Sequence, residues 1–439
     1  MSYIVIPIFS DPFLHPLHKD NGLSLLYVKG SDGDSQMICQ FHPDCVGVLE
    51  DYKWLEDELI FTPDAKILQH IYPFKNVIDM NWAWWSETNQ PFDMSKVRNN
   101  AYDFFYNKYY NAKRLNEIIP ILKHKEWCEE LEREMGKIID MDYEIVEHHR
   151  YSDEVTEAFG YIESNGVKVS DDVCDIFDMR VKKHISNGRL YTKYNLWTST
   201  GRPANSFGNV NFAAMKPEQR KAIIPEYDML VEYDYDAYHL RLIGDLIGYE
   251  FEKESVHQHL AEKYGCSYEE SKQRSFRQLY GGIEKKVREN IIFFDLTHMK
   301  ISAYWAYFKS HKFIETDIYN RKLLSKNYTD MNKNKLFNYL IQAYETESNI
   351  KTIIELKQYL LDKKTKLVLY GYDSFLFDFS KDDGVSTLTE LKNILERNGH
   401  MVKSQAGSNY GEMNDISDND IPIRNFCRTM FSSMIIRVS

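Results

Sequence analysis

Cysteine is scarce in this sequence: 439 residues contain six. Six are too few to form a disulfide framework in a chain of this length, so we expect a reducing cytoplasm as its compartment. No apolar run approaches the roughly 20 residues that span a bilayer. The opening stretch MSYIVIPIF is apolar but has no charged leader and no small-residue cleavage site, so it predicts a buried strand rather than a signal peptide. Internal repeats and low-complexity linkers are also missing.

Positive charge is in deficit overall, with a formal net charge of −12, which argues against a protein that coats nucleic acid non-specifically. One segment differs. Residues 179–222 contain nine Lys or Arg and a single acid, Glu218. This segment therefore has a net charge of +8, and the rest of the chain has −20. A local basic segment on an acidic protein suits a phosphate-lined groove, and a solvated basic face is the alternative.

The pattern of apolar residues predicts a small α/β unit at the start and alternating strands and helices from residue 229 onward. Residues 99–139 have helical texture, with Leu115, Ile118, Ile119 and Leu122 at helix spacing. Residues 200–220 are rich in Gly, Pro, Asn and Ser and should be mostly irregular. The other expected elements are strands at 4–9, 23–28, 36–41 and 229–235, helices between 238 and 360, and a hairpin at 366–379.

Three segments carry residues suited to chemistry. An apolar strand ends at Asp234, directly before a helix, and two apolar strands meet at a turn that holds Asp373. Lys272, Phe276 and Tyr280 are spaced i, i+4, i+8, so they share one helix face, where a cation, a ring and a phenol could bind a triphosphate, a base and a sugar. Taken singly, these residues could equally be a helix cap, a turn residue and an amphipathic surface helix.

Six segments in order resemble motifs of the family A DNA polymerases, those like DNA polymerase I, across roughly residues 100–439. Asp234-Tyr-Asp-Ala-Tyr-His-Leu-Arg241 resembles their DYSQIELR motif, and Lys272 through Gly281 resembles their K-x3-F-x3-YG helix. Tyr372-Asp373-Ser374 stands where they have HDE. The other three segments resemble TxTGR, DIHxxxA and N-x-x-x-Q, and they are 198–202, 255–261 and 338–342.

The resemblance implies a role for each matching residue. Asp234 and Asp373 would hold two Mg²⁺ ions, with Mn²⁺ as a substitute and the Tyr235 carbonyl as a further ligand. Primer-template DNA and dNTPs are the implied partners. The implied nucleotide-binding residues are His239, His257, Lys272, Phe276, Tyr280 and Arg274; the implied DNA-binding residues are Arg202, Asn211, Asn338, Gln342 and Tyr372; Arg241 would support the metal region.

The implied fold class is α+β, a polymerase right hand whose palm has an antiparallel sheet, with helical fingers and thumb. We expect a degenerate exonuclease-like α/β domain at 1–95, thumb and connecting helices at 96–200, and a palm at 201–439 with fingers inserted at about 250–335. The first strand ends at Asp11 without a D-x-E carboxylate pair, so we expect no proofreading and a separate exonuclease or processivity subunit. A short phage-type or replication-element enzyme, working in bacterial or phage-infected cytoplasm, fits this description.

Some residues depart from the family pattern. His239 replaces the Glu that helps to exclude the ribose 2′-OH, Tyr268 replaces an Arg, and Tyr372 and Ser374 flank Asp373. A single-subunit RNA polymerase or primase-like enzyme is therefore one alternative, and a non-catalytic DNA-binding accessory on the same fold is another.

A different hypothesis concerns zinc. His15-x-x-His18 and Cys39-x-x-His42-x-x-Cys45 contain potential zinc ligands, although an expected strand separates them and their spacing fits no common finger pattern.

Overall fold

We describe a computed structural model of the chain, which covers residues 1–45, 50–93, 97, 100–139, 149–171, 176–177, 179–205, 211–252 and 255–416. The chain divides into two compact units. Unit 1 comprises Met1–Gly166, Phe177–Phe212 and Glu315–Asn327, and unit 2 comprises Val167–Ile176, Ala213–Ile314 and Tyr328–Ser439. No helix in the described part of the chain is both long and apolar enough to cross a membrane.

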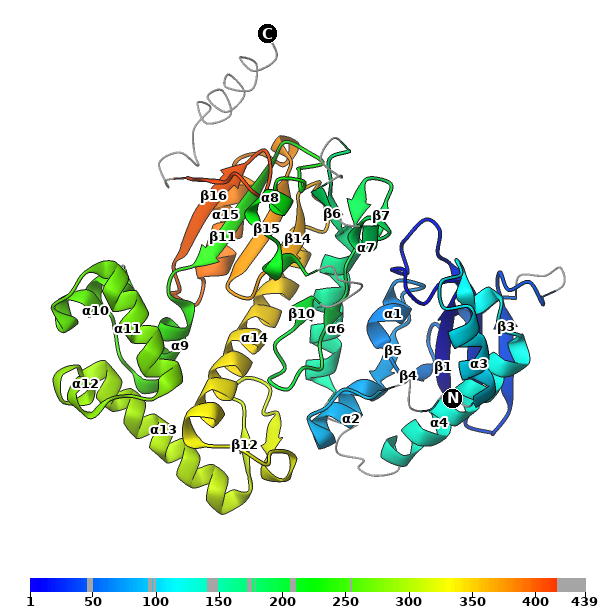
Figure 1. Ribbon diagram of the computed structural model, residues 1–439, viewed down its shortest axis with the longest axis horizontal. Helices are drawn as coiled ribbons and strands as arrows, with labels where there is room; N and C mark the ends of the chain where they lie inside the picture. Colours follow the sequence, from blue (N-terminus) through cyan, green and yellow to red (C-terminus); the bar gives the residue numbers. More distant parts are fainter. Residues whose placement is uncertain are drawn as a thin grey trace, which may run out of the picture. The chain divides into compact units, whose positions relative to one another are not determined.

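Unit 1 is built on a mixed five-stranded sheet in the order β3-β2-β1-β4-β5 (Figure 1). Its strands are β1 (Ser2–Phe9), β2 (Leu23–Gly30), β3 (Ser35–Cys39), β4 (Leu59–Thr62) and β5 (Asn76–Asp79). Pairing is antiparallel from β1 to β2 and β3, and parallel from β1 to β4 and β5. The apolar opening stretch is thus a strand, as expected.

Helices cover both faces of this sheet because side chains alternate along each strand. On one face, Ile6 and Ile8 of β1 pack with Leu131 and Met135 of α4 (Ile121–Ile139). On the other face, Val5 packs in the cluster that includes the helix α1 (Ala65–Gln69). The remaining helices of the unit are α2 (Met80–Thr88), α3 (Asn100–Lys108), α6 (Arg150–Asn165) and α7 (Met179–Lys182).

One sequence prediction for this region needs correction. The helix expected across 115–122 is interrupted, because Arg114 adopts a left-handed conformation and Pro120 precedes α4. Consequently Leu122 is 71% exposed instead of buried. Helix α4 packs on the sheet formed by residues 1–79, and the assignment of 96–200 to thumb and connecting helices stays a prediction.

The cysteines also differ from expectation. Cys39 and Cys45 form a disulfide, which closes a short loop after β3. This bridge does not make a framework, but it removes the two cysteines from any zinc site and weakens the inference of a reducing compartment.

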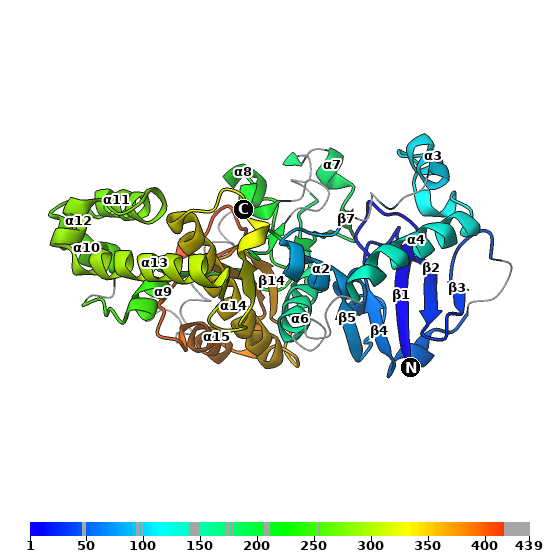
Figure 2. The ribbon, with the colours of Figure 1, turned by 90° about the horizontal axis from the view of Figure 1, so that it is seen from below.

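Unit 2 is built on an antiparallel five-stranded sheet in the order β14-β15-β11-β16-β17 (Figures 1 and 2). The strands are β11 (Met229–Tyr235), β14 (Lys366–Tyr370), β15 (Ser374–Phe379), β16 (Val402–Gly407) and β17 (Asn414–Asp415). The strand expected at 229–235 and the hairpin expected at 366–379 are confirmed. Helices α14 (Lys333–Tyr359) and α15 (Ser386–Glu396) lie on one face, where the Tyr233 and Tyr235 hydroxyls donate to backbone carbonyls of α15 at 2.9 and 2.7 Å.

A helical lobe continues unit 2 (Figure 2). It contains α9 (Tyr238–Ile247), α10 (Val256–Tyr264), α11 (Tyr268–Gly281), α12 (Lys285–Asn290) and α13 (Ile292–His311), and the short α8 (Pro217–Arg220) precedes the sheet. Leu240, Leu279, Phe293, Phe294 and Phe337 of these helices and α14 form one buried cluster. The lobe is therefore held by its own core. Short strand pairs that the sequence did not predict include β12 (Phe313–Glu315) with β13 (Lys322–Leu324).

Candidate active site

The sheet of unit 2 brings Asp234 and Asp373 together. β11 and β15 pair antiparallel with Asp234 opposite Ser374, and the Tyr235 amide donates to the Asp373 carbonyl at 2.9 Å. Both carboxyl groups are exposed although the strands behind them are buried. Two residues that lie 139 positions apart in the sequence thus share one edge, and a rigid antiparallel sheet holds both.

Negative charge accumulates at this edge. Desolvation, followed by repulsion from Asp373 and Glu232, raises the pKa of Asp234 to about 7. Burial raises the pKa of Glu232 as well, and Asp373 contributes to that shift. Clustered carboxylates are costly unless a cation neutralises them, so the edge is chemically suited to a hard divalent ion.

The backbone of the Asp373 turn is unusual. Tyr372 has a φ of +73°, a conformation that costs energy for a bulky residue. The buried side chain of Asn349 on α14 stabilises this turn, because its amide donates to the Tyr372 carbonyl at 2.7 Å and accepts from the Tyr238 hydroxyl at 2.9 Å. Asn349 therefore ties α9 to the hairpin tip.

A second acid behind the edge is neutralised within the protein. Asp236 is buried, and its carboxylate contacts Lys403 at 2.6 Å and Arg241 at 3.5 Å. Arg241 also donates to the Asp236 carbonyl at 2.9 Å. Burial alone would lower the pKa of Lys403, but the hydrogen bond and charge of Asp236 raise it. Arg241 thus binds the buried acid Asp236, and its role in supporting the metal region stays a prediction; the sequence did not indicate Lys403.

Helix α11 presents the expected stripe to solvent. Lys272, Phe276 and Tyr280 are all exposed, and the two rings stack with an interplanar angle of 8° and a centroid separation of 6.1 Å. His257 of α10 is buried beside Phe276, with ring centroids 6.1 Å apart. Burial lowers the pKa of His257, and Lys272 and Lys403 lower it further. The structure therefore places three of the predicted nucleotide-binding candidates on one exposed helix face, with a fourth, the buried His257, next to Phe276.

Arg274 is not part of that surface. It lies two residues after Lys272, which places it on another side of the helix, and it pairs with Glu270 at 2.6 Å. Its guanidinium also lies over the Tyr264 ring at 5.8 Å. Periodicity alone distinguishes Arg274 from Lys272, a distinction that the sequence prediction did not draw.

His239 is linked to two partners. Its Nδ1 lies 2.7 Å from the Tyr280 hydroxyl, and its Nε2 lies 3.3 Å from a carboxylate oxygen of Glu345. In the neutral tautomer in which Nδ1 accepts from Tyr280, the proton is on Nε2, which lies near Glu345 but makes no hydrogen bond within the described residues. Glu345 is 1% exposed on α14, so a buried carboxylate lies beside a residue that contacts the exposed stripe.

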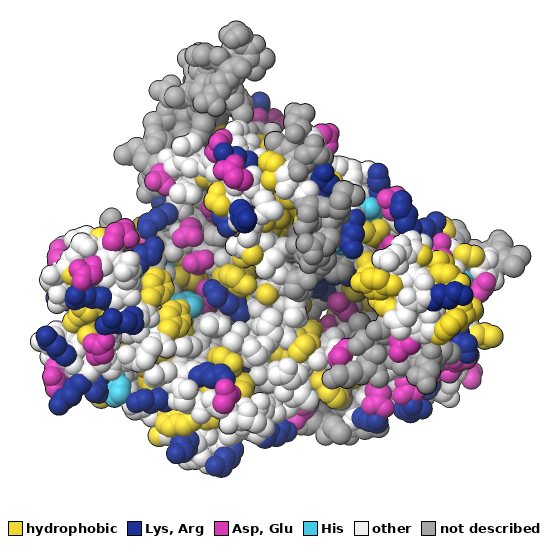
Figure 3. Space-filling model, in the orientation of Figure 1, with side chains coloured by type: hydrophobic (Ala, Val, Ile, Leu, Met, Phe, Trp, Pro, Cys, Tyr) yellow, Lys and Arg dark blue, Asp and Glu magenta, His cyan; other side chains and the backbone are white. Residues whose placement is uncertain are grey.

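The surroundings of His239 form a small hollow lined by Tyr280, Asn338, Ile341 and other residues of α9, α11 and α14. Figure 3 shows hydrophobic side chains over α9 and acidic side chains between them and the sheet. Gln342, half-buried on α14, follows Asn338 by about one turn. Sequence reasoning missed Glu345 and Asn349, which lie one turn apart on α14 among several other buried polar residues, so their spacing alone did not single them out.

Two predicted DNA-binding residues belong to unit 1. Arg202 lies in a turn in which its own backbone carbonyl accepts a hydrogen bond from the Thr198 hydroxyl at 2.9 Å. Asn211 is exposed. Their DNA-binding role stays a prediction.

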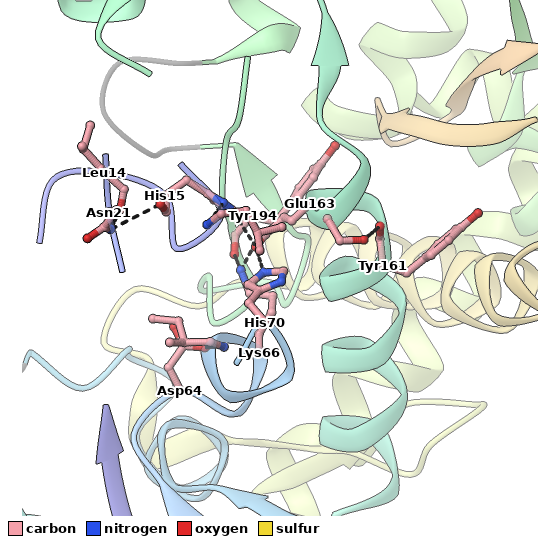
Figure 4. A network of polar contacts seen from close by, with 12 residues as sticks. Leu14, His15, Asn21, Asp64, Lys66, His70, Tyr161, Glu163 and Tyr194 are labelled. Carbon is pink, nitrogen blue, oxygen red and sulfur yellow. Dashed lines mark hydrogen bonds and ion pairs between the residues drawn. The ribbon is translucent and has the colours of Figure 1, made fainter. Parts of the chain in front are cut away.

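Unit 1 contains a different polar cluster around Glu163 of α6 (Figure 4). His15 and His70 place their Nε2 atoms 3.8 and 3.4 Å from one Glu163 oxygen, and Lys66 pairs with the other. These three groups are close enough for a metal ion. However, His15 Nδ1 accepts from the Leu17 amide at 3.2 Å, so the proton of neutral His15 is on Nε2, the atom a metal would need. His18 points to the Ile185 carbonyl instead. We therefore interpret the cluster as a buried ion-pair network and not as a zinc site.

Comparison with known proteins gives one informative result. No protein-family model matches the chain, and no curated protein matches its sequence. Among solved structures, the chain is similar to the POL domain of Pol1 from M. smegmatis in complex with DNA primer-template and dNTP, with a TM-score of 0.63 and 13% identity. The match covers 93% of this chain and 96% of that one. At this identity the similarity shows a shared fold: the chain has the fold of a DNA polymerase domain.

Proposed function

We propose that the chain is a DNA-directed DNA polymerase that extends a primer on a template by two-metal nucleotidyl transfer from dNTPs. The observation that carries this proposal is that Asp234 and Asp373 lie together at the exposed ends of the paired strands β11 and β15, beside a helix that presents Lys272, Phe276 and Tyr280. The fold shared with a polymerase domain supports it. The proposed family is A, and the proposed partners are primer-template DNA and dNTPs.

The edge residues fit divalent cations. Asp234, Asp373 and the Tyr235 carbonyl offer hard oxygen ligands, and the pKa of Asp234 is raised first by desolvation and then by the negative charges of Asp373 and Glu232. Lys403, the nearest compensating cation, is bound to Asp236. Two Mg²⁺ ions bound here would supply Lewis-acid activation of the primer 3′-oxygen and of the leaving pyrophosphate.

The helix surface supplies the other requirements of nucleotidyl transfer. Lys272 has an exposed ammonium group that would bind the triphosphate of the incoming nucleotide. Phe276 and Tyr280 are exposed and parallel, so they would pack against its sugar and base. His239 fixes the Tyr280 hydroxyl, which places that ring for contact with the sugar.

We further propose that the chain does not proofread. Asp11, at the end of β1, uses its two carboxylate oxygens to accept from the amides of Phe13 and Arg114 at 2.9 and 3.3 Å. Phe13 occupies the position where a second carboxylate would complete a D-x-E pair. A separate exonuclease, with or without a processivity subunit, would then act with this chain. Metal-dependent removal of a mismatched primer end by the purified chain would contradict this part of the proposal.

Primer extension tests the central proposal. The purified chain should extend a labelled primer with Mg²⁺ and four dNTPs, and chelation of the metal should stop extension. Asp373→Asn should abolish extension while duplex binding is retained, because metal charge acts mostly in the transition state. Asp362→Asn, which changes an exposed acid in the loop after α14, is the matched control and should extend normally. Normal extension by Asp373→Asn would remove the assignment.

A further inference from the structure

Unit 1 has a cavity of about 860 Å³, distant in sequence from the residues discussed for catalysis. Its walls come from the loop after β1 (residues 11–22), Phe41, residues 110–114 between α3 and α4, and Lys183. This volume lies within the range of sites that bind small organic groups, roughly 300–1,000 Å³.

The cavity is basic, and three of its cations are not neutralised. Lys19, Lys113 and Lys183 are exposed, and within the described part of the chain none has a carboxylate at ion-pairing distance. A fourth cation, Arg114, pairs with Glu117 at 2.5 Å. The Asp11 carboxylate is only 8% exposed and is bound by backbone amides. One exposed acid, Asp20, also lines the cavity, so a ligand meets three lysines without a carboxylate partner and a single exposed carboxylate. The exposed charge on the lining is therefore mostly positive.

Aromatic rings accompany these lysines. Phe41 is 59% exposed and Tyr110 is 54% exposed, although large apolar side chains are usually buried. Phe13 packs edge-on against Tyr110 with centroids 5.0 Å apart, and the Lys183 ammonium lies 5.8 Å from the Phe13 ring centre. Exposed rings interleaved with cations are the arrangement that binds unpaired bases together with their phosphates.

The loop that forms one wall is rigid. The Asn21 side chain accepts from the Asp11 amide at 2.9 Å and donates to the Asp11 and Leu14 carbonyls at 3.1 and 3.2 Å. At its far end, the Lys19 amide donates to Ser186 at 2.9 Å. Because these contacts hold the wall in place without a ligand, binding would cost little conformational entropy.

We infer that this cavity, the unit 1 basic cavity, binds a short single-stranded segment of DNA. Phosphates contact Lys19, Lys113 and Lys183, and bases stack on Phe41 and Tyr110. The segment is single-stranded because bases in a duplex stack on each other and leave their faces covered. The inference does not depend on nucleotidyl transfer, so it goes beyond the proposed polymerase activity.

Fluorescence anisotropy of a labelled six-residue thymidine oligonucleotide with the full chain tests the inference. An unlabelled blunt-ended hairpin duplex is added at a saturating concentration, so that it occupies the surfaces of the chain that bind duplex DNA. The triple variant Lys19→Ala, Lys113→Ala, Lys183→Ala should weaken binding at least tenfold. It should also reduce the slope of log Kd against log salt by about 2, since each of three phosphate contacts contributes about 0.7. The matched control replaces three α4 lysines of unit 1 that pair with helical glutamates, and should bind as wild type; these are Lys123, Lys125 and Lys137.

A second variant separates bases from phosphates. Phe41→Ala with Tyr110→Ala should weaken oligonucleotide binding while the salt slope stays unchanged, because stacking releases no counterions. Inorganic polyphosphate should compete poorly; competition equal to that of the oligonucleotide would overturn the base-stacking role. Wild-type binding by the lysine variant, or equal weakening by the control, would overturn the site itself. Thermal unfolding confirms that each variant is folded, and primer extension with the same samples reports separately on the proposed polymerase activity.

Discussion

The contact between His239 and Glu345 changes what the substitution His239→Glu would report. The sequence resemblance suggests this substitution as a probe of sugar selection, since the family has Glu there. In the structure, however, His239 Nε2 lies 3.3 Å from a Glu345 oxygen, and Glu345 is 1% exposed. A second carboxylate at that place would face a like charge at a cost of about 4 kcal/mol for a separation near 4 Å and an effective dielectric constant of 20.

We therefore expect His239→Glu alone to lower both the melting temperature and the extension rate. The double variant His239→Glu, Glu345→Gln should recover both, because the repulsion is removed and the new Glu can accept from the Tyr280 hydroxyl. Single-nucleotide incorporation with dNTP and with NTP, beside thermal unfolding, measures these effects. A His239→Glu enzyme as stable and active as the double variant would refute the reasoning.

Glu345 itself should influence sugar selection through His239. Glu345→Leu roughly retains side-chain volume but removes the carboxylate that lies 3.3 Å from His239 Nε2. We expect this loss to weaken the hydrogen bond from Tyr280 to His239, which is worth about 0.5–1.5 kcal/mol, so the kcat/KM ratio for dNTP over NTP should fall about two- to twelvefold. Glu345→Gln keeps a polar side chain of the same shape and should stay near the wild-type ratio. An unchanged ratio in Glu345→Leu would mean that Glu345 only fills space.

Two other predictions concern α11 and a buried histidine. Lys272→Ala should raise KM for dNTP at least tenfold, whereas Arg274→Ala should change it little because Arg274 pairs with Glu270; equal effects in steady-state extension would contradict this distinction. Burial lowers the pKa of His124 from 6.5 to about 4, so its contribution to stability is present above pH 6.5 and is lost as pH falls towards 4, by up to about 3 kcal/mol. His124→Gln should flatten that part of the pH profile in chemical denaturation, and an unaltered profile would show that His124 is not responsible.

The parts of the fold that the sequence predicted are those where local pattern and burial agree. β11 and the β14–β15 hairpin have apolar runs bounded by acids or a turn, so their type and position could be read directly. The prediction of a helix across 115–122 is wrong because the apolar residues have helix spacing but Pro120 interrupts the helix. Proline has no N–H and clashes with the preceding turn. The packing of α4 on the first sheet is a long-range contact, and periodicity shows only that the helix has an apolar face.

The residues of the candidate site could likewise be predicted only where their arrangement follows from the geometry of one helix or strand. Lys272, Phe276 and Tyr280 share a face for reasons of helix geometry, and their exposure agrees with that prediction. The same geometry should have excluded Arg274, which lies on another side. Glu345, Asn349 and Lys403 could not be assigned from order and spacing, because each acts on a residue more than a hundred positions away or on a different strand.

By itself, then, the sequence determined which residue types stand at strand ends, at the hairpin turn and along the α11 stripe, because these depend on periods of two and 3.6 residues within one element. Only the tertiary structure decided which of them meet. The antiparallel register of β11 and β15 places Asp234 beside Asp373, and α14 supplies the buried carboxylate that lies beside His239. In unit 1, the same kind of long-range assembly collects three lysines and exposed rings from separate loops into one cavity. Such contacts depend on how the elements pack against one another. The residues that pack are far apart in the sequence, so the periodicity within one helix or strand does not predict them.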